Sequence, residues 1–236
     1  MQSTGAVWLM TSLTPSPLLV ALVQTATSLP FFLLALPAGA LADVVDRRRL
    51  LLGMQGWMLT AAAVLGLLTL VGATTPWTLL ALTFLLGVGT AMNTPAWQAI
   101  TPDLVSRPEL PAAVALGGVA INLARAVGPA LGGLVVAAAG TGAVFLLNAA
   151  SFVGVMIVLY RWHPSPQTSA LPAEGVWGAM RVGLRYVRHA PALDVVLVRT
   201  AVFISCGSAL WALLPLVAQR EMGLSAVGYG VLLGCL

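Results

Sequence analysis

Charge is scarce in this chain, since only 8% of its 236 residues are charged and 59% are hydrophobic. Soluble domains average about 25% charged residues, so the composition excludes an ordinary soluble domain and indicates an integral membrane protein. Lysine is absent, and all eleven basic residues are arginines. Because the net charge of +4 comes from a few arginines, we do not expect a nucleic-acid partner.

Cysteine and histidine are equally sparse, with two of each. Cys206 and Cys235 lie in apolar segments, which gives no support to a structural disulfide. His163 and His189 are isolated, and the sequence contains no metal-ligand cluster, nucleophile elbow or phosphate loop. We therefore expect a protein that is not an enzyme and that uses neither a cofactor nor a metal.

Long apolar runs dominate the sequence. A helix needs about 20 apolar residues to cross a bilayer. Six runs meet this length and predict complete membrane spans, at residues 18–42, 50–71, 77–100, 112–139, 143–160 and 195–217. Shorter apolar pieces at 5–13 and 229–236 predict a chain that begins and ends inside a span. The predicted fold class is an all-α integral membrane protein.

The arginines give the predicted spans an orientation. Eight of them fall in segments that the spans place on one side, and only Arg220 falls on the other. Arginine-rich loops remain in the cytoplasm, so the side with eight arginines is predicted to be cytoplasmic. These eight residues are Arg47, Arg48, Arg49, Arg107, Arg161, Arg181, Arg185 and Arg188.

One polar stretch, at residues 162–192, divides the chain. It is predicted to be a cytoplasmic linker between a transmembrane part at 1–161 and a second transmembrane part at 193–236. Within it, residues 174–189 carry an apolar stripe beside an arginine stripe. This pattern is typical of an amphipathic helix lying in the lipid headgroup layer.

The densest charged cluster is the segment from Gly39 to Leu50. It resembles the loop between helices 2 and 3 of the major facilitator superfamily, whose pattern runs roughly Gly-x-Leu-Ala-Asp-Arg-x-Gly-Arg-Arg/Lys. The pattern is matched by Gly39, Leu41, Asp43, Arg47 and Arg48, and departed from at Val44 and Asp46. Such charges can pair with one another or cap a helix terminus, which would hold an inner gate shut. The alternative is that they only set the topology.

The span at 112–139 carries a second resemblance. Its run Gly128-Pro129-Ala130-Leu131-Gly132-Gly133 is similar to the Gly-Pro-x-x-Gly-Gly pattern on helix 5 of facilitator antiporters. Apart from that likeness, Gly118, Asn122, Arg125, Pro129 and Gly132 share one helix face, because they are spaced by four, three, four and three residues. Two interpretations stay open, a tight helix-packing seam and a hinge for alternating access.

Arg125 is the charge that we predict to lie near the bilayer midplane, where an arginine costs about 2.5–3.5 kcal/mol to insert. We expect its face to turn toward the bundle, so that it meets a wet cavity or a partner on another helix. Either a functional or a structural role fits. The candidate substrate-cavity residues are Arg125, Asn122, Asn93 and Gln24. All seven carboxylates lie in loops or at span ends, so no complete span supplies a carrier for a coupling proton.

Within the superfamily, the sequence most resembles the transmembrane secretion effector branch, which includes the enterobactin exporter. The resemblance rests on the alanine-rich spans, the arginine loop Asp-x-x-Asp-Arg-Arg-Arg, the run Asn93-Thr-Pro-Ala-Trp-Gln-Ala and the later Asn122-x-x-Arg125-x-x-Gly-Pro. The resemblance implies an N-terminal six-helix half with an incomplete helix 1, followed by helix 7 and the start of helix 8. It implies a secondary active exporter of a drug, siderophore or secondary metabolite, located in the bacterial inner (plasma) membrane and monomeric when complete. The partners would be a small-molecule substrate, the lipid bilayer and, as a coupling ion, protons. The alternatives are an importer of a metabolite and a truncated protein that does not transport.

Overall fold

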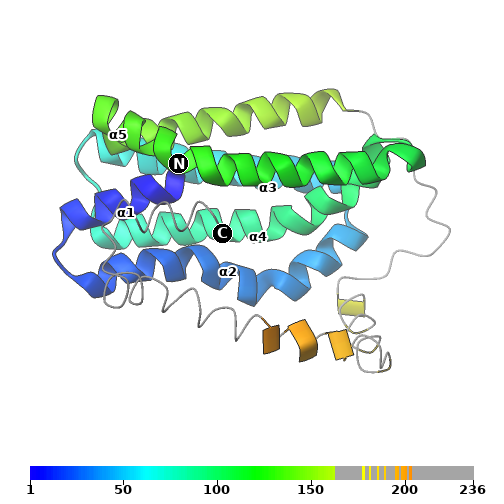
Figure 1. Cartoon of the computed structure of the whole chain (residues 1–236). Helices are drawn as coiled ribbons and strands as arrows, with labels where there is room; N and C mark the ends of the chain where they lie inside the picture. Colours follow the sequence, from blue (N-terminus) through cyan, green and yellow to red (C-terminus); the bar gives the residue numbers. More distant parts are fainter. Residues whose placement is uncertain are drawn as a thin grey trace, which may run out of the picture. The chain divides into compact units, whose positions relative to one another are not determined.

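The computed structural model describes residues 1–162 and isolated positions between 177 and 203. The chain forms two compact units, Met1–Met180 and Arg181–Leu236, and the first contains every helix described below. In order these are α1 (Gln2–Leu13), α2 (Pro17–Val44), α3 (Arg47–Leu70), α4 (Pro76–Leu104), a short 3₁₀ helix η1 (Arg107–Glu109) and α5 (Leu110–Arg161) (Figure 1). The predicted linker helix and the predicted spans at 195–217 and 229–236 fall almost wholly outside the described residues.

Among the residues that the structure describes, four segments are long and apolar enough to cross a bilayer: α2, α3, α4 and Arg107–Arg161. This confirms the predicted all-α membrane class. The 52 residues of α5 hold two spans, because Gly140 breaks the helix with a φ of 80° and a ψ of 172°. A positive φ is unfavourable for residues that carry a Cβ, so a glycine suits this position. The segments 110–139 and 141–161 correspond to the predicted spans at 112–139 and 143–160.

Asp46 decides where α3 begins. Its carboxylate accepts a hydrogen bond of 2.8 Å from the backbone N–H of Arg49 and so caps the helix. The sequence predicts that this span begins at residue 50, with the three arginines in the loop before it. The cap instead makes Arg47, Arg48 and Arg49 the first turn of α3.

The second segment of α5 packs antiparallel along α3. Leu51 shares one buried cluster with Leu159, and nearer the opposite end a Cβ on Gly66 would lie 2.7 Å from Leu146 Cδ2. Between them, Met58 and Ala149 belong to a third cluster. Small residues let the two helices approach closely, as in other membrane helix pairs.

Helices α2 and α4 run parallel to each other. Val23 and Leu79 meet near one end of the bundle, and Ala42 and Ile100 meet near the other. At mid-length, a Cβ on Gly87 would lie 2.9 Å from Pro30 Cγ. One pair is α2 with α4, and the other is α3 with the second segment of α5. Polar side chains of these four segments lie near one another at mid-height of the bundle.

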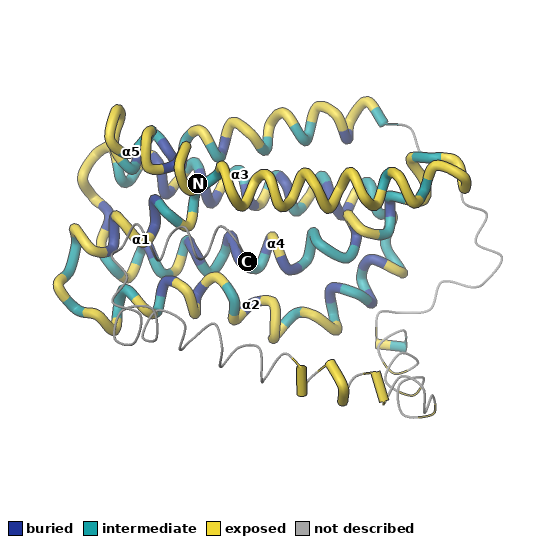
Figure 2. Tube along the Cα trace, viewed as in Figure 1, coloured by how far each residue is buried: buried dark blue, intermediate teal, exposed yellow. Residues whose placement is uncertain are grey.

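The first segment of α5 is different, since most of its residues from 111 to 139 are exposed (Figure 2). Among the described residues, its close contact is at Gly132, where a Cβ would lie 3.0 Å from Met1 Cα. Gly128 is also near Met1, at 3.4 Å from its amino nitrogen on the same construction. Met1, which directly precedes α1, is therefore the residue that packs against this segment.

Candidate functional site

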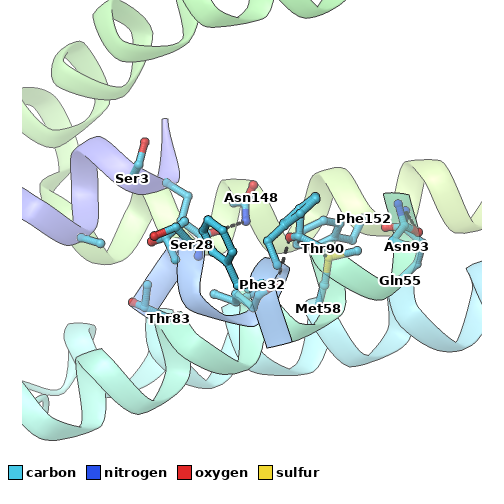
Figure 3. Close-up of a pocket in the computed structure, with 16 residues that line it drawn as sticks. Ser3, Ser28, Phe32, Gln55, Met58, Thr83, Thr90, Asn93, Asn148 and Phe152 are labelled. Carbon is cyan, nitrogen blue, oxygen red and sulfur yellow. Dashed lines mark hydrogen bonds between the residues drawn. The ribbon is translucent and has the colours of Figure 1, made fainter. Parts of the chain in front are cut away.

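A cavity of about 600 Å³ lies between the helices at mid-height of the bundle. Side chains from all five α-helices line it, which places it where bundle proteins usually hold small molecules. Its wall is formed by Gln2, Ser3, Ala6, Thr27, Ser28, Phe31, Phe32, Gln55, Met58, Thr83, Leu86, Gly87, Thr90, Asn93, Asn148 and Phe152. Figure 3 shows Phe32, Asn148, Phe152, Thr90 and Met58 gathered at its centre.

The lining has a consistent chemistry. It combines amides and hydroxyls with the rings of Phe31, Phe32 and Phe152, and none of its members carries a charge. Phe32 remains 85% exposed, so the cavity has an open side in the described part of the chain. Such a site suits a ligand with an apolar body and a few hydrogen-bonding groups.

Two amide pairs cross between helices in this wall. The Asn148 side-chain amide of α5 donates to Gln2 Oε1 of α1. The Gln55 side-chain amide of α3 donates to Asn93 Oδ1 of α4 over 3.4 Å, which is a long hydrogen bond. Gln55 Oε1 and the hydroxyl oxygen of Thr83 are buried without a hydrogen-bond partner in the described part of the chain.

Of the four predicted cavity residues, Asn93 lines the cavity and the other three do not. Gln24, Asn122 and Arg125 are exposed among the described residues. The structure therefore differs from the expectation that Arg125 and its face turn into the bundle. In the described part of the chain, the close contacts of this segment's glycines are those of Gly128 and Gly132 with Met1, and Asn122 and Arg125 lie away from them.

The residues of the predicted Gly-Pro segment, 128–133, differ in burial. Gly132 is buried against Met1, and Gly128 is half-buried beside it. Pro129 and Gly133 are exposed, and a Cβ on Gly133 would meet nothing within 4 Å. Close helix packing thus occurs at two of the four predicted positions in the described part of the chain.

The arginines at the start of α3 join three helices at one end of the bundle. Arg47 Nη1 lies 3.0 Å from the carboxylate of Asp103 and donates over 3.2 Å to the Ala99 carbonyl, both on α4. Arg48 donates over 3.0 Å to the Leu159 carbonyl and also donates to the Tyr160 carbonyl of α5. Its guanidinium also lies 5.7 Å from the centroid of the Tyr160 ring. We call these contacts the arginine latch.

The sequence predicts that Asp43 pairs with the loop arginines or caps a neighbouring helix terminus. In the structure, the carboxylate that contacts Arg47 is that of Asp103. Asp43 is exposed and forms no ion pair within residues 1–162. Asp46 caps α3, and Gly39 has nothing within 4 Å of a built Cβ. Asp103 lies in the last turn of α4, 56 residues after Arg47, so the charge order of the segment 39–50 alone could not identify it.

One pattern in the sequence of α4 indicates cavity residues beyond the four predicted candidates. Thr83, Gly87, Thr90 and Asn93 recur at spacings of four, three and three, which places them on one face of α4. All four line the cavity. Gln55 of α3 and Asn148 of α5 line the cavity as well.

Comparison with known proteins agrees with this architecture. The family described as transmembrane secretion effector matches residues 1–236, the whole chain. The staphyloferrin A transporter of Staphylococcus aureus (strain NCTC 8325 / PS 47) is 30% identical over 157 residues, which cover 66% of this chain and 40% of that protein. An uncharacterized MFS-type transporter, YfiS, of Bacillus subtilis (strain 168) is 24% identical over 75% of this chain and 42% of its own.

A third relative, macrolide efflux protein A of Streptococcus pyogenes, is 27% identical over 44% of this chain and 26% of its own. No solved structure matches the chain. The chain spans at most about 42% of the length of these relatives.

Proposed function

Because the chain belongs to the transmembrane secretion effector family, within the major facilitator superfamily, we propose that it forms the N-terminal half of a secondary active exporter of a small organic compound. Its relatives are transporters, so the role is membrane transport. Export would proceed by alternating access, in which two halves rock around a site near the bilayer midplane. The proposed location is the bacterial inner (plasma) membrane.

The observation that carries this proposal is the uncharged cavity at mid-height of the bundle. Its volume of about 600 Å³ lies in the range of about 300–1,000 Å³ that is usual for small-molecule sites. It lies between helices that are long enough to span a membrane. A substrate held there would be shielded from lipid and reachable from an aqueous side.

The relatives support export of organic compounds in particular. One is named for staphyloferrin A and another for macrolide efflux. We extend these classes to the present protein, with drugs, siderophores and other secondary metabolites as candidate substrates. Protons are the proposed coupling ion, and a monomer is the proposed state of the complete protein.

The arginine latch is proposed to close the inner gate. Arg47 and Arg48 tie the start of α3 to the ends of α4 and α5, so breaking these bonds would let the three helix ends separate. Asp46 supports the latch because it caps the turn that presents both arginines. Gly39 and Asp43 are proposed to act when the inner gate is open, a state in which Asp43 would gain a partner.

The domain division is also a proposal, with the N-terminal half at 1–161, the linker at 162–192 and the next half from 193. In the first segment of α5, Gly128, Pro129, Gly132 and Gly133 would serve as a packing seam or hinge. On exposed surfaces, Gln24, Asn122 and Arg125 keep the proposed role of meeting substrate or a partner helix.

The test is accumulation of a macrolide in an efflux-deficient bacterial host that expresses the full coding frame containing residues 1–236. We expect lower accumulation than in the empty host, with the difference abolished by a protonophore. Ser28→Trp should fill the cavity and abolish the difference. Thr25→Trp is the matched control, because Thr25 is exposed on the same helix and does not line the cavity.

Three outcomes would contradict the proposal. Higher accumulation would indicate an importer. Accumulation equal to that of the empty host, for macrolides and for a panel of siderophores and drugs at normal protein abundance, would indicate a protein that does not export them. Equal activity of Ser28→Trp and Thr25→Trp would exclude this cavity as the substrate site.

A further inference from the structure

Three threonines line the cavity, and one of them differs from the others in the hydrogen bonding of its hydroxyl. The hydroxyls of Thr27 and Thr90 donate over 2.9 Å to the carbonyls of Val23 and Leu86, four residues earlier in their helices. This bond is the usual way for a helix to satisfy a threonine. Thr83 is only 5% exposed, and its hydroxyl has no hydrogen-bond partner among the described residues.

Gln55 presents a second buried polar atom in the same wall. It is 4% exposed, and its Oε1 has no hydrogen-bond partner within the described part of the chain. Its amide nitrogen makes one long bond of 3.4 Å to Asn93, as Figure 3 shows. If the side-chain amides of Gln55 and Asn93 were both rotated by 180°, so that oxygen and nitrogen exchanged places, one residue would still have an unbonded acceptor oxygen. The other would still have an unbonded N–H donor.

Unpartnered polar groups in a dry interior destabilise a fold, because they lose their hydrogen bonds to water without replacement. Two such groups in the wall of one cavity are therefore expected to have a partner in the working protein. Both belong to neutral side chains, and every other described member of the wall is neutral as well.

The rest of the wall defines what that partner would be. Phe31, Phe32 and Phe152, with Met58 and Leu86, offer apolar contact. A carboxylate entering here would find no cationic side chain in the described wall, since Arg47 and Arg48 are bonded at the arginine latch and Arg125 is exposed elsewhere. Burying an unpaired charge is far less favourable than burying a hydrogen-bonded neutral group.

We propose that Thr83 and Gln55 are the substrate-recognition groups of this cavity, and that the part of the substrate that enters it is uncharged. The ligand class is a compound with an aromatic or aliphatic body that carries hydroxyl or carboxamide groups at two separate places. Gln55 bonds Asn93, which follows Thr83 by ten residues on α4 and so lies about 15 Å further along the helix (Figure 3). The hydroxyl of Thr83 and the amide oxygen of Gln55 therefore hydrogen-bond to different polar groups of the substrate, while the phenylalanines hold the body between them. This inference rests on the proposed transport function and adds the substrate class and the two contact residues.

The probes are a diethylaminocoumarin carboxamide and the matching diethylaminocoumarin carboxylate, which share one fluorescent body and differ in charge. Binding to the purified full-length protein in lipid nanodiscs is measured by fluorescence anisotropy. We expect the carboxamide to bind at least about tenfold more tightly than the carboxylate, because only the latter must bury a charge. Similar affinities for the two, tighter binding of the carboxylate, or no binding of either would overturn the proposed substrate class.

The contact residues are tested with a matched pair of isosteric changes. Thr83→Val should weaken carboxamide binding about three- to tenfold, the usual loss for one neutral hydrogen bond. It should leave the thermal unfolding midpoint unchanged or higher, because it removes an unpartnered hydroxyl. Thr90→Val should leave carboxamide affinity within about twofold, because its hydroxyl is already bonded within α4.

Gln55→Met should leave carboxamide affinity within about twofold, because the single carboxamide of this probe cannot reach both Thr83 and Gln55. A loss of binding with Gln55→Met and none with Thr83→Val would move the carboxamide contact from Thr83 to Gln55. Equal effects of Thr83→Val and Thr90→Val on binding would overturn the assignment of Thr83.

The proposed transport function and the proposed recognition groups can fail separately. Export of macrolides without carboxamide binding leaves the transport function standing and removes this inference. Carboxamide binding without export of any compound keeps the recognition groups and removes the transport function.

Discussion

The two segments of α5 have similar sequences and different surroundings. Both are rich in alanine, glycine and valine, and each is long enough to cross a bilayer. The segment 141–161 packs along α3 and buries Val144, Phe145, Ala149 and Leu159. The segment 110–139 buries Gly132 alone among the described residues. In an apolar helix the sequence therefore does not show which face will be covered, and the neighbouring helix decides it.

The largest expected effect lies in the packed seam of the second segment. Gly66→Val should destabilise the protein by about 3 kcal/mol, the upper part of the usual range for overpacking. A Cβ at Gly66 would lie 2.7 Å from Leu146 Cδ2 and 3.2 Å from its backbone nitrogen. The measurement is fluorescence-detected size exclusion after heating.

The control for this change is Gly117→Val in the first segment, where a Cβ meets nothing within 4 Å. It should leave the unfolding midpoint within error of the parent protein. Equal losses for the two variants would mean that both segments are packed alike and would erase the contrast between them.

The next effect concerns the end of the second segment. Arg48→Gln removes the charged donor to the Leu159 and Tyr160 carbonyls, which α5 leaves without helical partners. We expect a loss of about 1.5 kcal/mol, because hydrogen bonds to charged groups are stronger than neutral ones. Thermal unfolding at low and high salt should show the difference shrinking as salt rises.

Arg49→Gln is the matched control for the latch, since this arginine is exposed and its backbone N–H, not its side chain, bonds Asp46. It should change the midpoint little. A larger loss for Arg49→Gln than for Arg48→Gln would contradict the latch geometry.

A smaller effect separates two adjacent glycines of the first segment. Gly132→Val should cost about 1 kcal/mol, at the low end for overpacking, because a Cβ there would lie 3.0 Å from Met1 Cα, which is less crowded than the 2.7 Å at Gly66. Gly133→Val should be neutral, because its Cβ would enter open space. The reverse order in thermal unfolding would show that another element covers Gly133 more closely than Met1 covers Gly132.

The smallest effect is expected at Arg125, which is exposed in the described part of the chain. Arg125→Leu should change the free energy of unfolding by less than about 0.5 kcal/mol, as for other surface positions. Membrane abundance should rise or stay equal, because the change removes an insertion penalty of about 2.5–3.5 kcal/mol. Arg125→Lys, which keeps the charge, should match the parent in both assays. A clear loss of folded protein in Arg125→Leu would reveal a partner for the guanidinium.

Several features followed from the sequence, because they depend on how each residue interacts with lipid. Charge is unfavourable in hydrocarbon whatever the fold, so the sequence places the spans within residues 1–162 to within a few residues. The break at Gly140 lies between the predicted spans at 112–139 and 143–160. The same exclusion grouped Arg47 and Asp103 in predicted loops on one side, and the structure brings them together.

The cavity, by contrast, was decided by tertiary structure. A membrane helix is apolar on the lipid side and largely apolar on the protein side, so its pattern does not mark an inward face as it would in water. For this reason the sequence predicts an inward Arg125, and the shared face of Thr83, Gly87, Thr90 and Asn93 on α4 is known to line a cavity only from the structure. Whether the hydroxyl of Thr83 has a partner, or whether Arg47 meets Asp43 or Asp103, depends on how closely helices far apart in the chain approach one another. Those distances are set by the packing of α2 against α4 and of α3 against the second segment of α5.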